Sequence, residues 1–253
     1  MAESLEQAWE LNQKGRNNII IGGNLWLKMG NRNILNAIDL STLGLDRIEE
    51  DESGFRIGCM ATLRDIEMHE GLNKEFQNLF KEAVRHIVGV QFRNCATVGG
   101  SIFPKLGFSD VLTAFLACYT QVILYKKGEV SLREFIYMPL DNDILTHIYV
   151  KKDGRKTAYE SFRMTETDFP TLTCAMAMVD GRFETVLGAR PKHAEVVIDE
   201  ELADSLSKED VASYAKRVID KLQYGSNIRG SKQYRKQLSK VLISRCISRL
   251  TEE

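Results

Sequence analysis

Two pairs of adjacent glycines, each preceded by an apolar stretch, constrain this chain more than any other feature. The first pair ends the apolar run of NNIIIGGNLWL at Gly22 and Gly23, and the second lies in NCATVGGSIF at Gly99 and Gly100. Adjacent glycines allow unusual backbone angles and remove side chains, so that main-chain N–H groups can approach a ligand closely. Such a turn can form an anion-binding concavity, and a helix that begins just after it adds its positive end. Two loops of this kind would suit the two phosphates of a pyrophosphate.

Each glycine pair also has a simpler interpretation, since a tight turn after a strand favours glycine whether or not a ligand is present. Neither stretch matches GxGxxG within a βαβ unit, and neither carries the GK[ST] of a phosphate-binding loop. A Rossmann fold and a P-loop NTPase are therefore disfavoured. From the residues alone, a tight turn and a phosphate site both stay open.

Length and charge exclude several classes of function. The chain has 253 residues, enough for one large domain or two modest ones. Its 34 basic and 35 acidic residues give a formal net charge of −1, which offers no electrostatic reason to expect nucleic acid or an anionic membrane as a partner. No apolar run reaches the roughly 18 residues that span a bilayer. The first residues, MAESLEQAWELNQKG, are acidic and unlike an export signal, so we expect a cytoplasmic protein.

Cysteine and histidine give no sign of a metal site or of acid–base catalysis. The five cysteines form no CxxC pair and no cluster with histidine, so the sequence predicts neither zinc nor an iron–sulfur cluster on this chain. Apolar surroundings such as FLACY and LTCAMAM are typical of buried, reduced cysteines. The cysteines are Cys59, Cys95, Cys118, Cys174 and Cys246. The histidines, expected to be surface or packing residues, are His69, His86, His147 and His193.

The amino-terminal pattern predicts a small α/β unit. Apolar residues at helical spacing predict a helix over residues 3–14, and Gly15 is placed to end it. Short apolar runs predict strands at residues 19–21, 33–38 and 55–59, the last of which opens the next unit.

The middle of the chain predicts a larger unit of helices and strands. Thr62 and Asp65 form an approximate capping box for one helix, and an apolar stripe predicts another over residues 73–87. Ser109 and Asp110 can cap the helix VLTAFLAC. Strands are predicted at QVILY and, after the turn Lys127-Gly128, at EVSLREF.

The carboxy-terminal region reads as strands first and helices after. ILTHIYV is predicted to pair with KTAYESFRM across the turn Asp153-Gly154. The apolar run 171–179 and FETVLGA flank Asp180-Gly181, which is a hairpin signature. From about residue 198 the sequence becomes charged and favours helix, with Ser207 and Asp210 as an approximate capping box. This order is typical of an α+β unit.

The order of four stretches resembles a known family. IGGNLWL, FRIGCMATLRDIE, VQFRNCATVGGSI and FSDVLTAFLAC resemble, in that order, the FAD-binding medium subunit of molybdenum hydroxylases of the xanthine, carbon monoxide and nicotinate dehydrogenase type. The family loops read roughly AGGTDL and RNxATxGGN, followed by an S-D pair at the spacing of Asp110. SNIRGSKQYRKQLSKVLISRCI also resembles the family's D-x-R-x-S-x-x-Y-R helix. The resemblance covers about residues 15–248.

The resemblance implies an α+β fold with a FAD-binding domain of the PCMH / vanillyl-alcohol-oxidase type. That domain would consist of two α/β subdomains, residues 1–55 and 56–150, with FAD between them. A subdomain of sheet and helices, residues 151–253, would follow.

The resemblance also implies a set of cofactor-binding residues. The predicted cofactor-binding residues are Ile21, Gly22, Gly23, Asn24, Leu25, Ala96, Thr97, Val98, Gly99, Gly100, Ser101, Asp110, Arg163 and Asp168. Asp110 is expected to bind the adenosine ribose or a neighbouring polar group, although it can also cap its helix. Asn24-Leu25 replaces the usual Thr-Asp, Ser101 replaces an Asn, and the lysine that often precedes the Arg163 region is absent.

The function implied is electron transfer within a multi-subunit oxidoreductase. Electrons would pass from iron–sulfur clusters on a small subunit through this FAD to NAD⁺ or another acceptor, while a large molybdopterin subunit oxidises the substrate. The cofactor performs the redox chemistry, so no catalytic residue is assigned. Ile102, Phe103 and Leu106 are candidates for a partner interface, or else pack internally against the flavin or the helix after Asp110. Two alternatives stay open, a stand-alone flavoprotein oxidoreductase and a degenerate, non-redox scaffold of the same fold.

Overall fold

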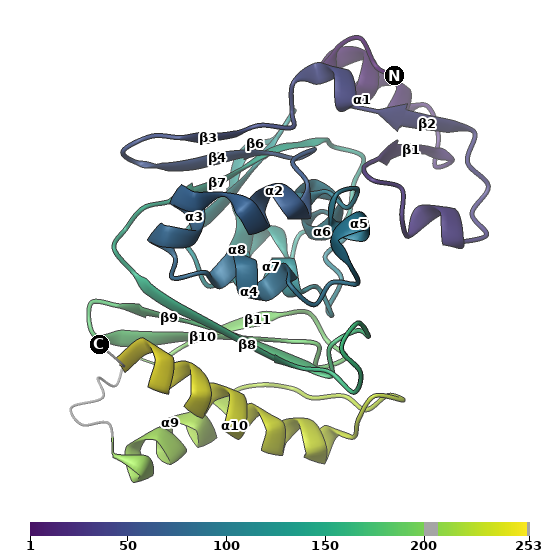
Figure 1. Ribbon diagram of the computed structural model, residues 1–253. Helices are drawn as coiled ribbons and strands as arrows, with labels where there is room; N and C mark the ends of the chain where they lie inside the picture. Colours follow the sequence, from purple (N-terminus) through teal and green to yellow (C-terminus); the bar gives the residue numbers. More distant parts are fainter. Residues whose placement is uncertain (200–206, 252–253) are drawn as a thin grey trace.

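The computed structural model describes residues 1–199 and 207–251, so the segments 200–206 and 252–253 of the predicted third subdomain lie outside the described residues. The described residues form three β-sheets. One sheet has two strands, one has four and one has five. Figure 1 shows the N-terminal unit at the top, the largest sheet with short helices beneath it, and the remaining sheet with the C-terminal helices at the base.

The N-terminal unit is a helix packed on two parallel strands. α1 (Leu5–Gln13) begins after Ser4, whose side chain caps it, and ends before Gly15 as predicted. β1 (Asn18–Ile21) pairs with β2 (Asn36–Asp39), which is shorter than the predicted strand 33–38. The connection contains the 3₁₀ turn η1 (Leu27–Met29), and η2 (Ser41–Leu43) follows β2.

The five-stranded sheet joins segments far apart in the sequence. Its antiparallel order is β3-β4-β7-β5-β6, so that β7 lies in the centre. The strands are β3 (Ile48–Glu50), β4 (Gly54–Gly58), β5 (Thr120–Leu124), β6 (Gly128–Ser131) and β7 (Leu145–Lys151). The predicted strand EVSLREF is a strand only up to Ser131, after which the chain forms α8 (Leu132–Phe135).

Short helices fill the space between the two larger sheets (Figure 1). They are α2 (Leu63–Met68), α3 (Glu70–Glu75), α4 (Leu79–Val84), α5 (Val90–Arg93), α6 (Val98–Ile102) and α7 (Asp110–Leu116). The capping box of Thr62 and Asp65 at the start of α2 is confirmed.

The single helix predicted over 73–87 is wrong, because the chain breaks between α3 and α4. Gln77 and Asn78 have φ values of 45° and 63°, in the left-handed region. The Gln77 side chain accepts a hydrogen bond from the Thr157 N–H (2.6 Å), and the Phe76 carbonyl accepts one from the Thr157 hydroxyl (2.6 Å). These bonds to a distant strand replace the helical bonds that a continuous helix would make.

The third unit is a four-stranded antiparallel sheet covered by two helices. Its strand order is β11-β10-β9-β8. The strands are β8 (Lys156–Phe162), β9 (Leu172–Val179), β10 (Arg182–Gly188) and β11 (Glu195–Ile198), and the helices are α9 (Lys208–Asp220) and α10 (Lys232–Thr251). The hairpin at Asp180-Gly181 and the capping box at Ser207 are confirmed.

The predicted pairing of ILTHIYV with KTAYESFRM is wrong. β7 lies inside the five-stranded sheet, whereas β8 is an edge strand of the four-stranded sheet. The segment between them is held by Arg155, which pairs with Asp153 (2.5 Å) and donates to the Ala117 carbonyl (2.5 Å). The chain therefore crosses from one sheet to the other instead of turning back on itself. The predicted subdomain boundaries at residues 55 and 150 stay a prediction.

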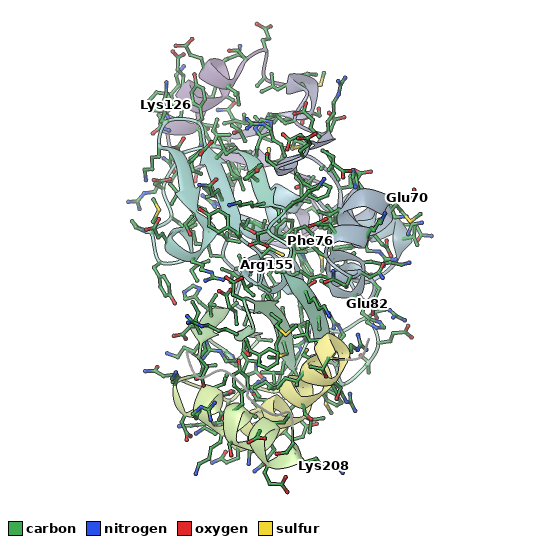
Figure 2. All side chains as sticks on the ribbon, turned by 90° about the vertical axis from the view of Figure 1, so that its left-hand side faces the viewer. Glu70, Phe76, Glu82, Lys126, Arg155 and Lys208 are labelled. Carbon is green, nitrogen blue, oxygen red and sulfur yellow. The ribbon has the colours of Figure 1, made fainter. Side chains whose placement is uncertain are left out.

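Two apolar cores hold these layers together. One fills the space around the short helices and the five-stranded sheet, and the other lies between the four-stranded sheet and the helices α9 and α10. Figure 2 shows Phe76 and Arg155 in the interior, whereas Lys126 and Lys208 lie at the surface. Among the described residues, no helix has both the length and the apolar character that a bilayer span requires.

A buried ion pair fastens α5 to α2. Arg93 donates to both carboxylate oxygens of Glu67 (2.8 and 3.1 Å), and Arg64 donates to the same carboxylate (2.8 Å). Burial acts to raise the pKa of Glu67, but the hydrogen bonds from Arg93 and Arg64 outweigh it and lower that pKa. The pair therefore holds the helix that leads into the second glycine pair.

The cysteines follow the prediction with one exception. Cys59, Cys118, Cys174 and Cys246 are buried, and burial raises the pKa of the Cys59 thiol to about 12. Cys95, immediately before the second glycine loop, is exposed.

Candidate functional site

A cavity of about 830 Å³ lies where the three units meet. This volume falls within the range of about 300–1,000 Å³ that is usual for small-molecule and cofactor sites. Residues that line the cavity come from β1 and the loop after it, from the short helices, and from the loop 163–170 that follows β8.

Thirteen of the fourteen predicted cofactor-binding residues line this cavity, so the structure brings the two glycine loops and the distant residues of the third unit together. The thirteen are Ile21, Gly22, Gly23, Asn24, Leu25, Ala96, Thr97, Gly99, Gly100, Ser101, Asp110, Arg163 and Asp168. The exception is Val98, whose side chain is buried in the first core. Their role in binding stays a prediction.

The first glycine pair lies directly against the second loop. A Cβ atom on Gly22 would lie 2.4 Å from the Thr97 hydroxyl oxygen, and one on Gly23 would lie 1.7 Å from the Cys95 carbonyl oxygen. Neither glycine has a left-handed φ; in this loop it is Asn24, with φ of 56°, that takes that conformation, and asparagine tolerates it better than most residues. Close contact between the loops, not unusual backbone angles, therefore requires these glycines.

The N–H groups of residues 22–25 donate no hydrogen bond to any described residue. Backbone N–H groups are obligatory donors that seek a partner. Successive unpaired N–H groups beside a cavity form an anion-binding concavity. The first loop therefore offers the donors that were expected of it.

The second loop differs from the prediction, because its N–H groups are already bonded within the protein. Val98 donates to the Ala61 carbonyl (2.8 Å) and Gly99 to the Cys59 carbonyl (2.8 Å). Gly100 donates to the Thr97 hydroxyl (3.1 Å), which caps α6, and Ser101 donates to the Thr97 carbonyl (3.1 Å).

The second loop contributes to the cavity a stretch of backbone that carries no side chains at Gly99 and Gly100. A Cβ atom on Gly99 would lie 2.7 Å from the Cys59 carbonyl oxygen, so that glycine is required by packing. Gly100 is exposed and lines the cavity. The loop thus contributes shape rather than free main-chain donors.

Asp110 lies at the centre of a buried polar cluster that it forms with Tyr159 and Arg163. Ser109, not Asp110, caps α7 by accepting from the Leu112 N–H (3.1 Å). The Asp110 carboxylate is left to accept from the Tyr159 hydroxyl (2.5 Å) and the Arg163 guanidinium (2.6 Å), both at Oδ1. Burial raises the pKa of the Asp110 carboxyl, while Arg163 and Tyr159 oppose that rise.

The loop 163–170 is tied down on both sides. Arg163 donates to the Ser161 hydroxyl (2.5 Å) and to the Asp168 carbonyl (3.1 Å). The Asp168 carboxylate pairs with Arg229 through two bonds (2.7 and 3.0 Å), and this hydrogen bonding lowers the pKa of Asp168. Asp168 therefore positions the loop, and its partner Arg229 was not predicted, although it lies within the family-like stretch SNIRGS.

An aromatic wall on the cavity was also missed by sequence reasoning. Trp26 stacks on Phe169 with ring centroids 5.1 Å apart, and Phe108 packs on Phe169 at 4.4 Å. Phe92 meets Trp26 edge-on at 5.8 Å. All four side chains line the cavity, and Trp26 stays 48% exposed. Single aromatic residues in four separate segments give no periodic signal in the sequence.

The structure also places two sets of residues whose roles the sequence left open. His86 keeps a side-chain exposure of 34% but also lines the cavity, and burial and then Arg163 lower its pKa, so its place beside the site adds to the expectation. Ile102 is fully buried, which favours internal packing over a partner interface for this residue, and Phe103 is half-buried against Phe135. Leu106 is 36% exposed and keeps its place as a candidate.

Comparison with known proteins finds a matching family model and two relatives that cover most of the chain. Residues 1–150 match the family model described as the FAD binding domain in molybdopterin dehydrogenase. The glyceraldehyde dehydrogenase medium chain of Sulfolobus acidocaldarius is 26% identical over 264 residues, which cover 95% of this chain and 93% of that protein. The 6-hydroxypseudooxynicotine dehydrogenase complex subunit alpha of Paenarthrobacter nicotinovorans is 24% identical over 284 residues, covering 98% and 92%.

Solved structures show the same fold. A chain of carbon monoxide dehydrogenase from Hydrogenophaga pseudoflava superposes with a TM-score of 0.86 at 23% identity, covering 98% of this chain and 95% of that one. A chain of quinoline 2-oxidoreductase from Pseudomonas putida 86 also gives 0.86, at 17% identity and with 98% and 94% covered. The predicted fold class is confirmed.

Proposed function

Because the chain belongs to the family of FAD-binding domains of molybdopterin dehydrogenases, we propose that it serves as the flavin-carrying medium subunit of a multi-subunit molybdenum hydroxylase. Its electrons come from iron–sulfur clusters on a small subunit and leave the FAD for NAD⁺ or another acceptor. A molybdopterin subunit oxidises the substrate. The names "medium chain" and "complex subunit alpha" of two relatives support this multi-subunit arrangement.

The observation that carries the proposal is the row of unpaired N–H groups at residues 22–25 beside the cavity. These donors fit a pyrophosphate, which is anionic and accepts several hydrogen bonds. The bare surface of Gly100 lets such a group approach the second loop, and the aromatic wall around Trp26 suits a planar ring. When bound, FAD supplies the redox chemistry of the site.

The chain's own residues then have three tasks. The first loop holds the phosphates, Asp110 accepts a hydrogen bond from a sugar hydroxyl, and Trp26 with Phe169 excludes water from one end of the cavity. No side chain of the site is assigned a proton-transfer role.

A titration of the ligand-free chain with FAD and with FMN tests the cofactor assignment. FAD should bind at least tenfold more tightly, because only FAD carries the pyrophosphate that the first loop fits. Equal affinities would refute the assignment of the loops, and no affinity for either flavin would favour the non-redox scaffold.

The electron-transfer role requires a second experiment. The chain is co-expressed with candidate iron–sulfur and molybdopterin subunits, captured by a tag, and mixed with substrate in the absence of oxygen. Bleaching of the flavin only in the complex supports the proposal. Reduction of the isolated chain's flavin by a small substrate would point to a stand-alone flavoprotein instead.

A further inference from the structure

We propose that Tyr159 is a positioning residue, which holds Asp110 so that the carboxylate's free oxygen accepts a hydrogen bond from a ribose hydroxyl of FAD. This inference rests on the proposed function. It adds a residue from outside both glycine loops and from outside every predicted site.

The hydrogen bonds of Asp110 are unevenly divided between its two oxygens. Tyr159 and Arg163 both donate to Oδ1, whereas Oδ2 accepts from no other described residue. Among the described residues, every side-chain oxygen that is shielded from solvent has a hydrogen-bond partner. An oxygen without a partner, such as Oδ2, is therefore not shielded. Since Asp110 also lines the cavity, Oδ2 is open to it.

The groups around the carboxylate are themselves fixed. Tyr159 is 4% exposed and packs in the first core, so its hydroxyl has little freedom to turn away. The Arg163 guanidinium is held by Ser161 and by the Asp168 carbonyl. On the side of α7, the Thr113 hydroxyl lies 3.0 Å from that of Thr173 on β9. Both sides of the contact are therefore rigid.

The charges select the kind of group that Oδ2 can bind. Arg163 already neutralises Asp110, so the cluster gives little attraction for a second cation. A phosphate would be repelled by the carboxylate. A neutral hydroxyl is the remaining donor, and a hydrogen bond from it to a charged oxygen is stronger than one between neutral groups. The ribose of FAD carries such hydroxyls.

Three variants test the inference by FAD titration. Tyr159→Phe removes only the hydroxyl, and we expect the FAD dissociation constant to rise about three- to tenfold, as the loss of one ordinary hydrogen bond would cause. Asp110→Asn should raise it tenfold or more. The double variant should be no weaker than Asp110→Asn alone, because the two residues act through one contact. Tyr214→Phe is the matched control, since Tyr214 is equally buried but bonds Thr185 in the third unit, and it should bind FAD like the unmodified chain.

A ligand change separates positioning from a structural effect. The unmodified chain should bind an FAD analogue without ribose hydroxyls less tightly than FAD, and Tyr159→Phe should discriminate between the two ligands less. A chain that does not discriminate, or a Tyr159→Phe variant that keeps full FAD affinity, overturns the inference while the proposed function stands. Failure of the unmodified chain to bind FAD overturns both. The melting temperature of each ligand-free variant shows whether its fold is intact, and multiplicative losses in the double variant also refute the inference.

Discussion

Gly23→Ala is the substitution that most directly tests the contact between the two loops. Its methyl carbon would lie 1.7 Å from the Cys95 carbonyl oxygen and 2.4 Å from the carbonyl carbon. To restore an ordinary contact of 3.4 Å, one loop must move by about 1.7 Å. Both atoms in conflict are fixed by the backbone, so no side-chain rotation can relieve the overlap.

The cost follows from overpacking a tight contact. Such changes typically cost about 1–3 kcal/mol in unfolding free energy, and we expect the upper end here because backbone must shift. Removing a glycine stiffens the unfolded chain, but that gain of about 0.4–1 kcal/mol is too small to offset the strain. For a chain of this size, about 3 kcal/mol corresponds to a melting temperature lower by roughly 6–12 °C. The displaced donors should also weaken FAD binding more than tenfold.

Thermal and urea unfolding of the ligand-free chain, followed by FAD titration, measure both effects. Gly100→Ala is the matched control: its methyl carbon meets only the Thr97 hydroxyl, at 3.0 Å, and lies within a short helix. Its stability should stay close to that of the unmodified chain, while the methyl group at the cavity weakens FAD binding. A Gly23→Ala chain that unfolds at the same temperature and urea concentration as the unmodified one would refute the reasoning.

Three other predictions concern separate parts of the molecule. Glu67→Gln should lower the unfolding free energy at pH 7 by about 3–5 kcal/mol, because it leaves the charge of the buried Arg93 without a carboxylate to neutralise it. Since the pKa of Glu67 is lowered by folding, its contribution is complete above the ordinary pKa of about 4.3 and is lost as pH falls through the lowered value; urea unfolding at pH 3 should show a smaller difference between the two chains. A thiol reagent at pH 7 should modify Cys95 quickly and the four buried cysteines only on unfolding, as peptide mapping would show. FAD should quench the fluorescence of a Trp9→Phe chain, whose remaining tryptophan lines the cavity, far more than that of a Trp26→Phe chain.

Local signals in the sequence predicted local structure well. The capping boxes at Thr62 and Ser207 and the hairpin at Asp180-Gly181 depend on residues within four positions of one another, and each is confirmed. The two glycine loops of the cavity lining were also predicted from the sequence, because the motifs that resemble the family mark them, whereas the aromatic wall was not.

The structural features that could not be predicted from the sequence depend on contacts between residues far apart in the chain. The apolar stripe of residues 73–87 was correct, but the backbone N–H and the hydroxyl of Thr157, about eighty residues away, stabilise the break at Gln77. ILTHIYV and KTAYESFRM have the spacing of a hairpin, yet Arg155 carries the chain between two sheets. Likewise, no local pattern shows that Gly23 is required by Cys95 rather than by a ligand. Such assignments can be made only when the residue that makes the distant contact is known.

The position of the cavity at the meeting point of three units links ligand binding to the docking of those units. Because the first loop, the short helices and the loop 163–170 all line it, a cofactor that binds there binds only when the units are assembled. By mass action, free ligand at one hundred times its dissociation constant stabilises such an assembly by about 2.7 kcal/mol. The supply of flavin in the cell would then set how much of this chain survives degradation as well as how much can carry electrons.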